Sequence, residues 1–536
     1  MERQEYFQQR LTRAGEYLRA ADYDAARQIC RALLTEFADH PQILAMLGIL
    51  EGMDGHPDAA LDYLQRANNL HPGQPGIVNN LALALLNTGE LAAAEKHLKS
   101  CLKRHPAYTP AWYTLAVLNR RLGRIDEAIA AYERVLSLDP EQPEAWANLA
   151  KLRERLNQLQ LASEAVNRSL EISPSNPIAR MTAAQIDGRL GHHESAIDRL
   201  EALLSEQSLG DTNEIIARSR LGDSLDAVGR QPEAFAQYRE ANRLQAGSWL
   251  ASQPPGDGPY SLVAVGRMRR LLEETTGAVP EAAGNGTNGP FFLTGFPRSG
   301  TTLLDRMLSA HPDVCSIEEQ ETLVDSHRDF VVSTNGVERL LSLTEDRRRT
   351  YLDAYRRRVS DAAGPGAPVM LDKLPLHTIF LPLISRLFPG ARVIFMIRDP
   401  RDVCLSCFVQ RFEINAAMAH FLDLETTAQF YAAVMELGLD SLERLPIRAT
   451  SVRYEQLVAN PEPILRELID FLGLPWDPAV LAYRSRVTGS RIDTPSYRQV
   501  SQPLYSSSIG RWRRYAGELE PVQQVLAPLV SRLGYD

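Results

Sequence analysis

Alanine recurs in the first half of the chain at a fixed interval of 34 residues. The series is Ala26, Ala60, Ala94, Ala128, Ala162 and Ala196. Prolines keep nearly the same interval, at Pro41, Pro75, Pro110, Pro143 and Pro177. Because proline is tolerated in the first turn of a helix, where its missing N–H has no partner, each of them predicts a helix start. A repeat of this length indicates a stack of similar structural units.

One unit shows how the repeat is built. Residues 110–118 carry apolar side chains at helical spacing, a turn follows at Gly123, and residues 126–136 form a second amphipathic segment. The small side chain of Ala128 lets the two helices approach closely, while Trp112 and Tyr132 fill the groove between them. The sequence therefore predicts one helix hairpin in each unit.

This pattern resembles the tetratricopeptide repeat over residues 7 to about 245, as six or seven units. The first unit is weak, and the last is displaced because its alanine, Ala234, comes four residues late. Terminal repeats are expected to be atypical because one side has no neighbour. The resemblance implies a curved α-solenoid whose concave face holds a peptide or a partner helix. The alternative is a scaffold that only dimerises the chain or supports the next domain.

Two segments rich in glycine and proline interrupt the helical pattern after the repeats. They are residues 252–258 and 276–290, and they flank a helical stretch around Met268. We therefore expect a repeat solenoid at 1–245, a linker with one helix at 246–290 and a second domain at 291–536.

The second domain opens with a strand, a tight loop and a helix, at residues 291–295, 296–302 and 303–310. Such a loop aims backbone N–H groups and the positive end of a helix at one point, which favours a phosphate. The spacing from Gly295 to Thr302 matches the loop of nucleoside triphosphatases, but Thr301 stands where their lysine should be. The grip on a triphosphate is therefore missing.

Residues 297–302 resemble the 5′-phosphosulfate loop of sulfotransferases, which bind the sulfuryl donor 3′-phosphoadenosine-5′-phosphosulfate (PAPS). A second segment supports the resemblance: a strand at 392–398 leads into residues 399–406, which are similar to the family's 3′-phosphate motif. The resemblance implies a three-layer α/β domain with a mostly parallel sheet and donor contacts from both segments. These contacts are Arg298, Ser299, Gly300, Thr301, Thr302, Arg398 and Ser406.

The details are similar to tyrosylprotein sulfotransferases, and this resemblance implies the catalytic groups. The stretch 307–319 places the family's catalytic base on Glu319, with Glu318 as the rival base. The lysine that stabilises the bridging oxygen corresponds to Lys373, and Arg298 adds charge near the sulfuryl group. This chemistry requires no metal, and its product is 3′-phosphoadenosine-5′-phosphate (PAP).

Weaker similarities assign three more donor contacts. Tyr454 corresponds to a tyrosine at a strand end that contacts the adenosine, and Ser496 and Arg511 correspond to phosphosulfate contacts in a covering loop. For Arg511 the alternative is a solvated helix start.

The chain departs from the tyrosylprotein pattern at acceptor positions. Glu321 stands where those enzymes have an arginine that reads acidic residues, and a second arginine position falls on Gln410, with Arg411 one place late. Histidine bases are known in other sulfotransferases, which leaves His311 and His377 as alternatives to a glutamate.

Charge and hydropathy limit the partners. The 58 basic and 67 acidic residues give a net charge of −9, so no global basic field draws the chain to nucleic acid or anionic lipid. The opening segment has no apolar core of signal-peptide length, and no later run is long and apolar enough to span a membrane. We therefore expect a soluble, cytoplasmic protein, with a homodimer possible.

The sequence thus predicts a PAPS-dependent sulfotransferase whose acceptor is a hydroxyl, with tyrosine of a protein or peptide delivered by the solenoid as the favoured acceptor. Two alternatives stay open at this point. The acceptor is a glycan or small molecule in one, and the chain is a non-catalytic, nucleotide-binding repeat adaptor in the other.

Overall fold

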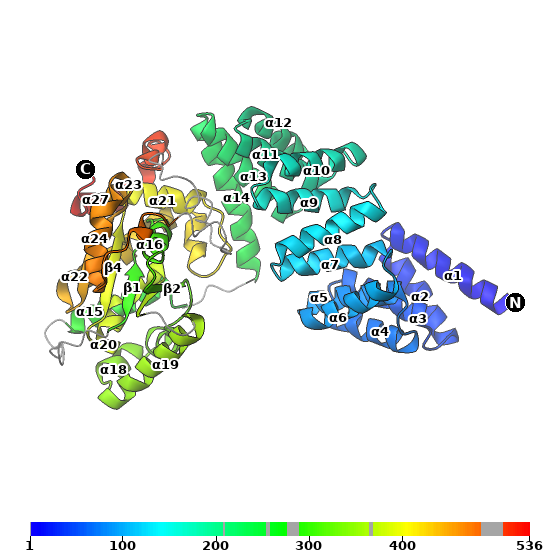
Figure 1. Cartoon of the computed structure of the whole chain (residues 1–536), viewed down its shortest axis with the longest axis horizontal. Coiled ribbons are helices and arrows are strands. Elements are labelled where there is room, and N and C mark those ends of the chain that lie inside the picture. The colour runs from blue at the N-terminus through cyan, green and yellow to red at the C-terminus, as the bar shows by residue number, and fades with distance from the viewer. Residues whose placement is uncertain (1, 207–208, 253–257, 276–288, 364–367, 484–507) are drawn as a thin grey trace. The chain divides into compact units, whose positions relative to one another are not determined.

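The computed structural model of the chain describes residues 2–206, 209–252, 258–275, 289–363, 368–483 and 508–536. Its contacts divide the chain into two compact units, 1–207 and 208–536. The first unit contains helices throughout, and the second contains a parallel sheet between helices (Figure 1).

The first unit consists of six antiparallel helix hairpins. Its helices are α1 (Glu2–Arg19), α2 (Tyr23–Glu36), α3 (Pro41–Met53), α4 (Pro57–Leu70), α5 (Pro75–Thr88), α6 (Leu91–Arg104), α7 (Thr109–Arg121), α8 (Ile125–Leu138), α9 (Pro143–Arg155), α10 (Leu159–Ile172), α11 (Pro177–Leu190) and α12 (His193–Ser205). Each odd-numbered helix packs against the next, and neighbouring hairpins stack side by side (Figure 1). The predicted helical solenoid is confirmed.

The periodic alanines and prolines have the structural roles that their spacing predicts. All six alanines of the 34-residue series lie on the second helix of a hairpin and are at most 2% exposed. Four prolines are the first residue of a helix, and Pro110 is the second residue of α7. A larger side chain at an alanine position would therefore separate the two helices of its hairpin.

A seventh hairpin belongs to the second compact unit. It consists of α13 (Asp211–Ala227) and α14 (Gln231–Ser252), and it buries the displaced alanine Ala234 completely. Tyr238 of α14 packs against Gly222 of α13, where a Cβ atom would lie 2.7 Å from the ring. The domain boundaries at 245 and 290 stay predictions.

The sheet has five strands in the order β2-β3-β1-β4-β5, and every neighbouring pair is parallel. The strands are β1 (Phe291–Thr294), β2 (Val314–Glu318), β3 (Val369–Lys373), β4 (Arg392–Ile397) and β5 (Arg448–Arg453). The register pairs Glu318 with Lys373 and Ile397 with Arg453, so these strands end level with their neighbours. The predicted parallel sheet is confirmed.

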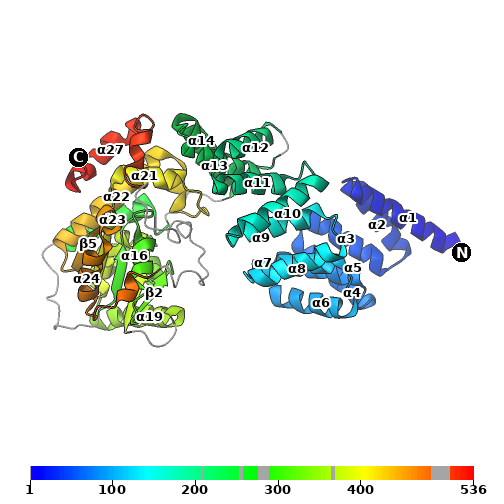
Figure 2. The same ribbon diagram turned by 45° about the horizontal axis from the view of Figure 1, so that its top comes forward.

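Helices cover both faces of this sheet (Figure 2). One face packs against α16 (Thr301–Leu308), α23 (Tyr454–Ala459) and α24 (Pro461–Leu472) around a continuous apolar core. The other face packs against α15 (Leu262–Thr275), α20 (Leu381–Leu387) and α22 (Leu424–Arg444), which also contact each other. On that side Gly438 of α22 lies directly against the ring of Phe395. The other α-helices in the described part of this sheet-containing unit, apart from α13 and α14, are α17 (Val324–Ser326), α18 (Gly336–Leu341), α19 (Glu345–Ala363), α21 (Pro400–Val409) and α27 (Glu520–Arg532).

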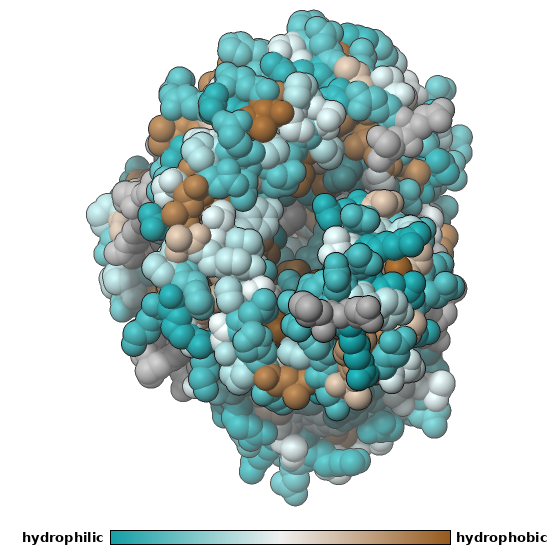
Figure 3. Space-filling model, turned by 90° about the vertical axis from the view of Figure 1, so that its right-hand side faces the viewer, coloured by the Kyte–Doolittle hydropathy of each residue, from teal (hydrophilic) through white to brown (hydrophobic). Residues whose placement is uncertain are grey.

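The surface drawn in Figure 3 is mostly hydrophilic, with hydrophobic residues in small separate groups. Among the residues that the structure describes, no helix combines the length and the hydrophobicity needed to cross a bilayer.

Candidate active site

Each of the five strands leads at its carboxyl end into a residue that the sequence predicts to act in the site. β1 leads into the loop that carries Arg298, β2 is followed by Glu319, and β3 ends at Lys373. β4 and β5 are followed by Arg398 and Tyr454. Because all strands are parallel, these residues gather at one edge of the sheet, where such sheets bind ligands.

Two glycines shape the loop at residues 295–302, which we call the phosphate loop after its predicted ligand. Gly295 and Gly300 both have positive φ angles, of 150° and 102°. A Cβ atom on Gly300 would lie 2.4 Å from Cδ2 of Tyr454, and one on Gly295 would lie 2.8 Å from the carbonyl oxygen of Met396. Only glycine fits these positions. The loop leads directly into α16, whose first N–H groups lack partners within the helix and are therefore available to an anion.

Arg298 joins the loop to the second predicted donor segment. Its Nε donates to Ser406 Oγ at 3.1 Å, and Arg398 Nη1 donates to the carbonyl oxygen of Arg298 at 2.9 Å. Arg298 has a φ angle of 68°, which is uncommon for a residue with a side chain. The two motifs, about 100 residues apart in sequence, are therefore in direct contact.

Arg398 and Tyr454 form the other side of this arrangement. The Arg398 guanidinium lies 4.6 Å from the centre of the Tyr454 ring, and Nη2 donates to the carbonyl oxygen of Ser508 at 2.6 Å. Tyr454 Oη lies 3.0 Å from Ser508 Oγ. Arg398 Nε is buried and has no hydrogen-bond partner within the described part of the chain. A buried, charged donor of this kind fits an anionic ligand.

Lys373 lies at the centre of the predicted catalytic groups. Its Nζ is 2.7 Å from Glu319 Oε1, 3.2 Å from Glu318 Oε1 and 3.5 Å from Thr302 Oγ1. Burial opposes the charge of this fully buried ammonium, but Glu319, Asp305 and Glu318 outweigh it, so the pKa of Lys373 is raised. The lysine is therefore a fixed cation beside the loop.

Glu319 is held in a strained conformation by its neighbours. Its φ angle is 52°, and its N–H donates to the carbonyl oxygen of Lys373 at 2.8 Å. Three residues later, Thr322 Oγ1 donates to buried Asp372 at 2.6 Å. Strained residues that the surrounding structure holds in place cluster at functional sites. Of the positive-φ residues with side chains in the described chain, Glu319 and Arg298 are the two in this unit.

The two adjacent glutamates differ in their surroundings. Glu318 is 21% exposed and pairs with both Arg306 and Lys373, whereas Glu319 is 40% exposed and pairs with Lys373. Glu319 therefore has more of its carboxylate open to an incoming acceptor.

Arg511 contacts a carboxylate of the last hairpin, whereas the sequence predicts that it contacts the phosphosulfate. Its Nη2 donates to Asp226 of α13 at 2.9 Å, and Tyr515 Oη donates to the same carboxylate at 2.7 Å. Within the described residues Arg511 makes no contact with the phosphate loop, so its donor role stays a prediction. Ser496 lies outside the described residues.

The two alternative histidines are both buried. His311 Nε2 bonds to the carbonyl oxygen of Pro475 and its Nδ1 accepts from the N–H of Asp313, so both ring nitrogens are engaged. His377 is fully buried, and burial lowers its pKa to about 3. Neither ring has a contact with Lys373 among those seen in the described chain.

Glu321, where the chain differs from the tyrosylprotein enzymes, also has defined hydrogen-bond partners. Its Oε1 accepts from Tyr260 Oη at 2.7 Å, and its Oε2 is 3.6 Å from His327 Nδ1. Burial raises the pKa of Glu321, but its hydrogen bonds with His327 and Tyr260 outweigh burial and lower it overall. An ionised carboxylate thus stands at the position where the tyrosylprotein enzymes have an arginine.

Sequence reasoning missed the residues that hold the site from outside. Asp402 accepts from the N–H groups of Gly510 and Trp512, at 2.6 and 2.8 Å, and so holds the C-terminal segment against α21. Asp402 stands within the motif at 399–406 and could have been singled out there. Asp226 could not, because nothing local in α13 indicates a partner 285 residues away.

Comparisons with known proteins agree with this geometry. Residues 290–478 match the sulfotransferase family, and residues 79–143 and 113–177 match the tetratricopeptide repeat. Protein-tyrosine sulfotransferase 1 of Danio rerio is 29% identical over 258 residues, which cover 46% of this chain and 72% of that protein.

Two further proteins are similar to parts of the chain. An uncharacterized protein of Aquifex aeolicus is 30% identical over 274 residues, which are 48% of this chain and 35% of the relative. The chain thus spans only about a third of that protein. A tetratricopeptide repeat protein of Parabacteroides merdae, a solved structure, covers 45% of this chain and 93% of its own at 16% identity, with a TM-score of 0.35. The two family matches show that the chain carries tetratricopeptide repeats in its N-terminal part and a sulfotransferase-family domain in its C-terminal part.

Proposed function

We propose that the second unit transfers a sulfuryl group from PAPS to the hydroxyl of a tyrosine in a protein or peptide. The observation that carries this proposal is the gathering of Arg298, Arg398, Lys373 and Glu319 at the carboxyl edge of one parallel sheet. Three cations and a helix N-terminus suit a polyanionic donor, and the carboxylate suits proton abstraction.

The loop residues fit the donor's 5′-phosphosulfate end. Ser299, Thr301 and Thr302 are buried in the loop and in the first turn of α16, where they and Gly300 would hold phosphate oxygens. Arg398 and Ser406 would hold the 3′-phosphate, and the ring of Tyr454 the adenosine. PAPS supplies the sulfuryl group, and no step requires a metal.

In the proposed step, the acceptor oxygen forms a bond to sulfur while the bond from sulfur to the bridging oxygen of the 5′-phosphate breaks. Glu319 takes the proton of the acceptor hydroxyl, and the electron pair of the broken bond stays on the bridging oxygen. Lys373 stabilises the charge that develops there, and Arg298 stabilises charge on the sulfuryl oxygens. Base and lysine are 2.7 Å apart, so both reach the same reacting centre.

Glu319 is the favoured base because its side chain is more exposed than that of Glu318 and forms an ion pair with Lys373 alone among the described residues. Glu318 lies between Arg306 and Lys373 and forms ion pairs with both, so its carboxylate is less open to an acceptor hydroxyl. Its surroundings support a role in holding Lys373.

The repeats support a polypeptide acceptor, since stacked repeats offer an extended binding surface. The similarity to protein-tyrosine sulfotransferases supports tyrosine as the hydroxyl. Glu321 supports a preference for acceptor peptides without acidic residues beside the tyrosine, because its carboxylate repels acidic side chains. A cytoplasmic location and a homodimer stay predictions.

The test is transfer by the full chain. It is incubated with PAPS and a library of tyrosine peptides, PAP is quantified by chromatography, and sulfated peptides are identified by mass spectrometry. The proposal expects PAP and sulfopeptide in equal amounts. A nucleotide-binding adaptor would give neither, and a glycan or small-molecule enzyme would give PAP only with those acceptors.

A truncated chain tests the role of the repeats, and the structure sets where to cut. Removal of residues 1–207 leaves α13 and α14 with the unit that they belong to, whereas removal of 1–245 would take Asp226 away from Arg511. The shorter truncation should weaken peptide sulfation and spare sulfation of a simple phenol. Equal activity on peptides would mean that the first six hairpins do not bind the acceptor.

A further inference from the structure

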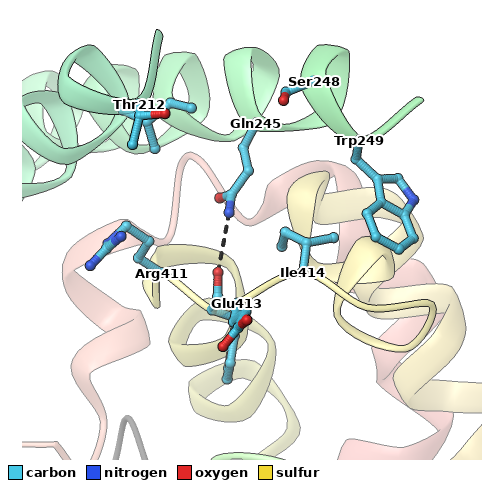
Figure 4. Close-up of a pocket in the computed structure, with 9 residues that line it drawn as sticks. Thr212, Gln245, Ser248, Trp249, Arg411, Glu413 and Ile414 are labelled. Carbon is cyan, nitrogen blue, oxygen red and sulfur yellow. Dashed lines mark hydrogen bonds between the residues drawn. The ribbon is translucent and has the colours of Figure 1, made fainter. Parts of the chain in front are cut away.

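A cavity of about 520 Å³ lies between the last helix hairpin and the loop that follows α21 (Figure 4). We call it the hairpin pocket. Its hairpin wall consists of Thr212, Ile215, Gln245, Ser248 and Trp249, on α13 and α14. Its loop wall consists of residues 411–414. The volume is in the range of binding sites for small molecules and short peptide segments.

The two walls are firmly joined, so the pocket is already formed. Gln245 Nε2 donates to the carbonyl oxygen of Phe412 at 3.1 Å (Figure 4). Buried Asn242 donates to the carbonyl oxygen of Phe408 at 2.9 Å, and the rings of Phe235 and Phe408 stack at 4.9 Å. A ligand that enters a preformed pocket does not have to order its walls.

The pocket is connected to the phosphate loop by aromatic contacts. The ring of Phe412 in the loop wall lies 5.4 Å from that of Phe421, which lies 5.7 Å from Phe296 in the phosphate loop. The same wall continues α21, which carries Ser406, the acceptor of the Arg298 hydrogen bond. The pocket is thus linked through two ring contacts to the loop that carries Arg298, and its lining includes none of the predicted catalytic residues.

The lining indicates what can bind there. It contains one cation and one carboxylate, Arg411 and Glu413, together with hydroxyls, an amide, an indole ring and Ile414. Opposite charges in one small site do not favour a polyanion such as a second nucleotide. The mixture of hydrogen-bonding and apolar groups suits the backbone and side chains of a polypeptide.

We infer that the hairpin pocket holds a segment of the acceptor polypeptide, a few residues away from the hydroxyl that is sulfated. This inference rests on the proposed function. Glu319 does not line the pocket, so a phenol bound at Glu319 leaves the pocket open. An extended chain gains about 3.3 Å per residue and can occupy both places. The pocket would thus select polypeptide acceptors over small ones.

The test compares Ser248→Arg, which fills the pocket, with Leu250→Arg on the same helix. Leu250 is 65% exposed and does not line the pocket, so both variants add the same charge to α14. We expect Ser248→Arg to raise KM for a tyrosine peptide about tenfold or more, while its kcat/KM for p-nitrophenol stays within twofold of that of Leu250→Arg. Equal peptide KM values in the two variants, or equal losses on peptide and phenol, would overturn the inference.

Peptide binding is measured in parallel by fluorescence anisotropy with a labelled tyrosine peptide. If the wild type transfers to no acceptor but binds the peptide, and Ser248→Arg abolishes that binding, the proposed function fails and the pocket stands. If an oligosaccharide shows the selective KM change instead, the occupant is a glycan and the inference is wrong.

Discussion

Asp226 of α13 receives hydrogen bonds from both Arg511 and Tyr515, at 2.9 and 2.7 Å, across 285 and 289 residues of sequence. The segment that it holds also reaches the donor side, because Ser508 accepts from Arg398 and contacts Tyr454. The last hairpin is therefore part of the framework around the donor site.

We expect Asp226→Asn to weaken PAP binding and to lower the free energy of unfolding by about 1–3 kcal/mol, because the Arg511 guanidinium loses its charged partner. Calorimetric PAP titration and thermal unfolding check both effects. Glu233→Gln, which breaks the exposed pair with Arg230, is the control and should change neither. PAP affinity equal to that of the wild type would show that Asp226 does not hold the donor site together.

Glu319→Gln should lower kcat by about 10²- to 10⁴-fold and leave PAP affinity near that of the wild type, because the amide cannot accept the acceptor proton. Initial rates with a tyrosine peptide and PAP titrations separate the two quantities. Glu318→Gln should have the smaller effect on kcat. The reverse order would assign the base to Glu318.

Gly300→Ala should reduce PAP affinity more than tenfold, because its Cβ atom would lie 2.4 Å from the Tyr454 ring at a φ angle of 102°. Equilibrium titration with PAP measures the loss. Gly266→Ala in α15 is the matched control, since its Cβ atom meets nothing within 4 Å, and it should bind PAP normally. Normal affinity in Gly300→Ala would contradict the close approach of the loop to Tyr454.

His377 makes stability depend on pH. Burial lowers its pKa from 6.5 to about 3, so between these values the unfolded chain binds a proton that the folded chain does not. This contribution to stability is full above pH 6.5 and is lost as the pH falls toward 3, by about 1.4 kcal/mol per pH unit at most. Denaturant unfolding between pH 4 and 7 measures this effect. As the pH falls, the free energy of unfolding should decrease less in His377→Gln than in the wild type.

Asp372 provides the control of opposite sign. Burial raises its pKa from 3.8 to about 7, so its contribution is full below pH 3.8 and is lost as the pH rises through 7. Asp372→Asn should therefore remove a loss of stability that the wild type shows as the pH rises from about 4 to 7. Identical pH profiles for both variants and the wild type would mean that the two groups titrate normally.

The repeats and the order of the sheet motifs could be predicted from the sequence because each depends on local spacing. The 34-residue alanine period predicts the hairpins, and a strand followed by a glycine loop and a helix predicts where the sheet begins. The contact of Arg298 with Ser406 could be expected only through the family resemblance, since it joins segments about 100 residues apart.

The rest depends on tertiary packing that local sequence does not report. Glu319 combines a left-handed backbone with an N–H bond to Lys373 on a neighbouring strand. The inclusion of α13 and α14 in the second unit results from contacts such as Asn242 with Phe408. Neither residue pair has a spacing or a composition that would have indicated its partner.

The most direct measurement of the central claim is a calorimetric titration of the full chain with PAP, followed by ATP and magnesium. The account predicts that PAP binds at one site and that Arg398→Ala removes this binding, while ATP with magnesium does not displace PAP. Tight binding of magnesium-ATP with no heat from PAP would contradict the account, because the loop at 295–302 would then serve a triphosphate instead of a sulfated adenine nucleotide.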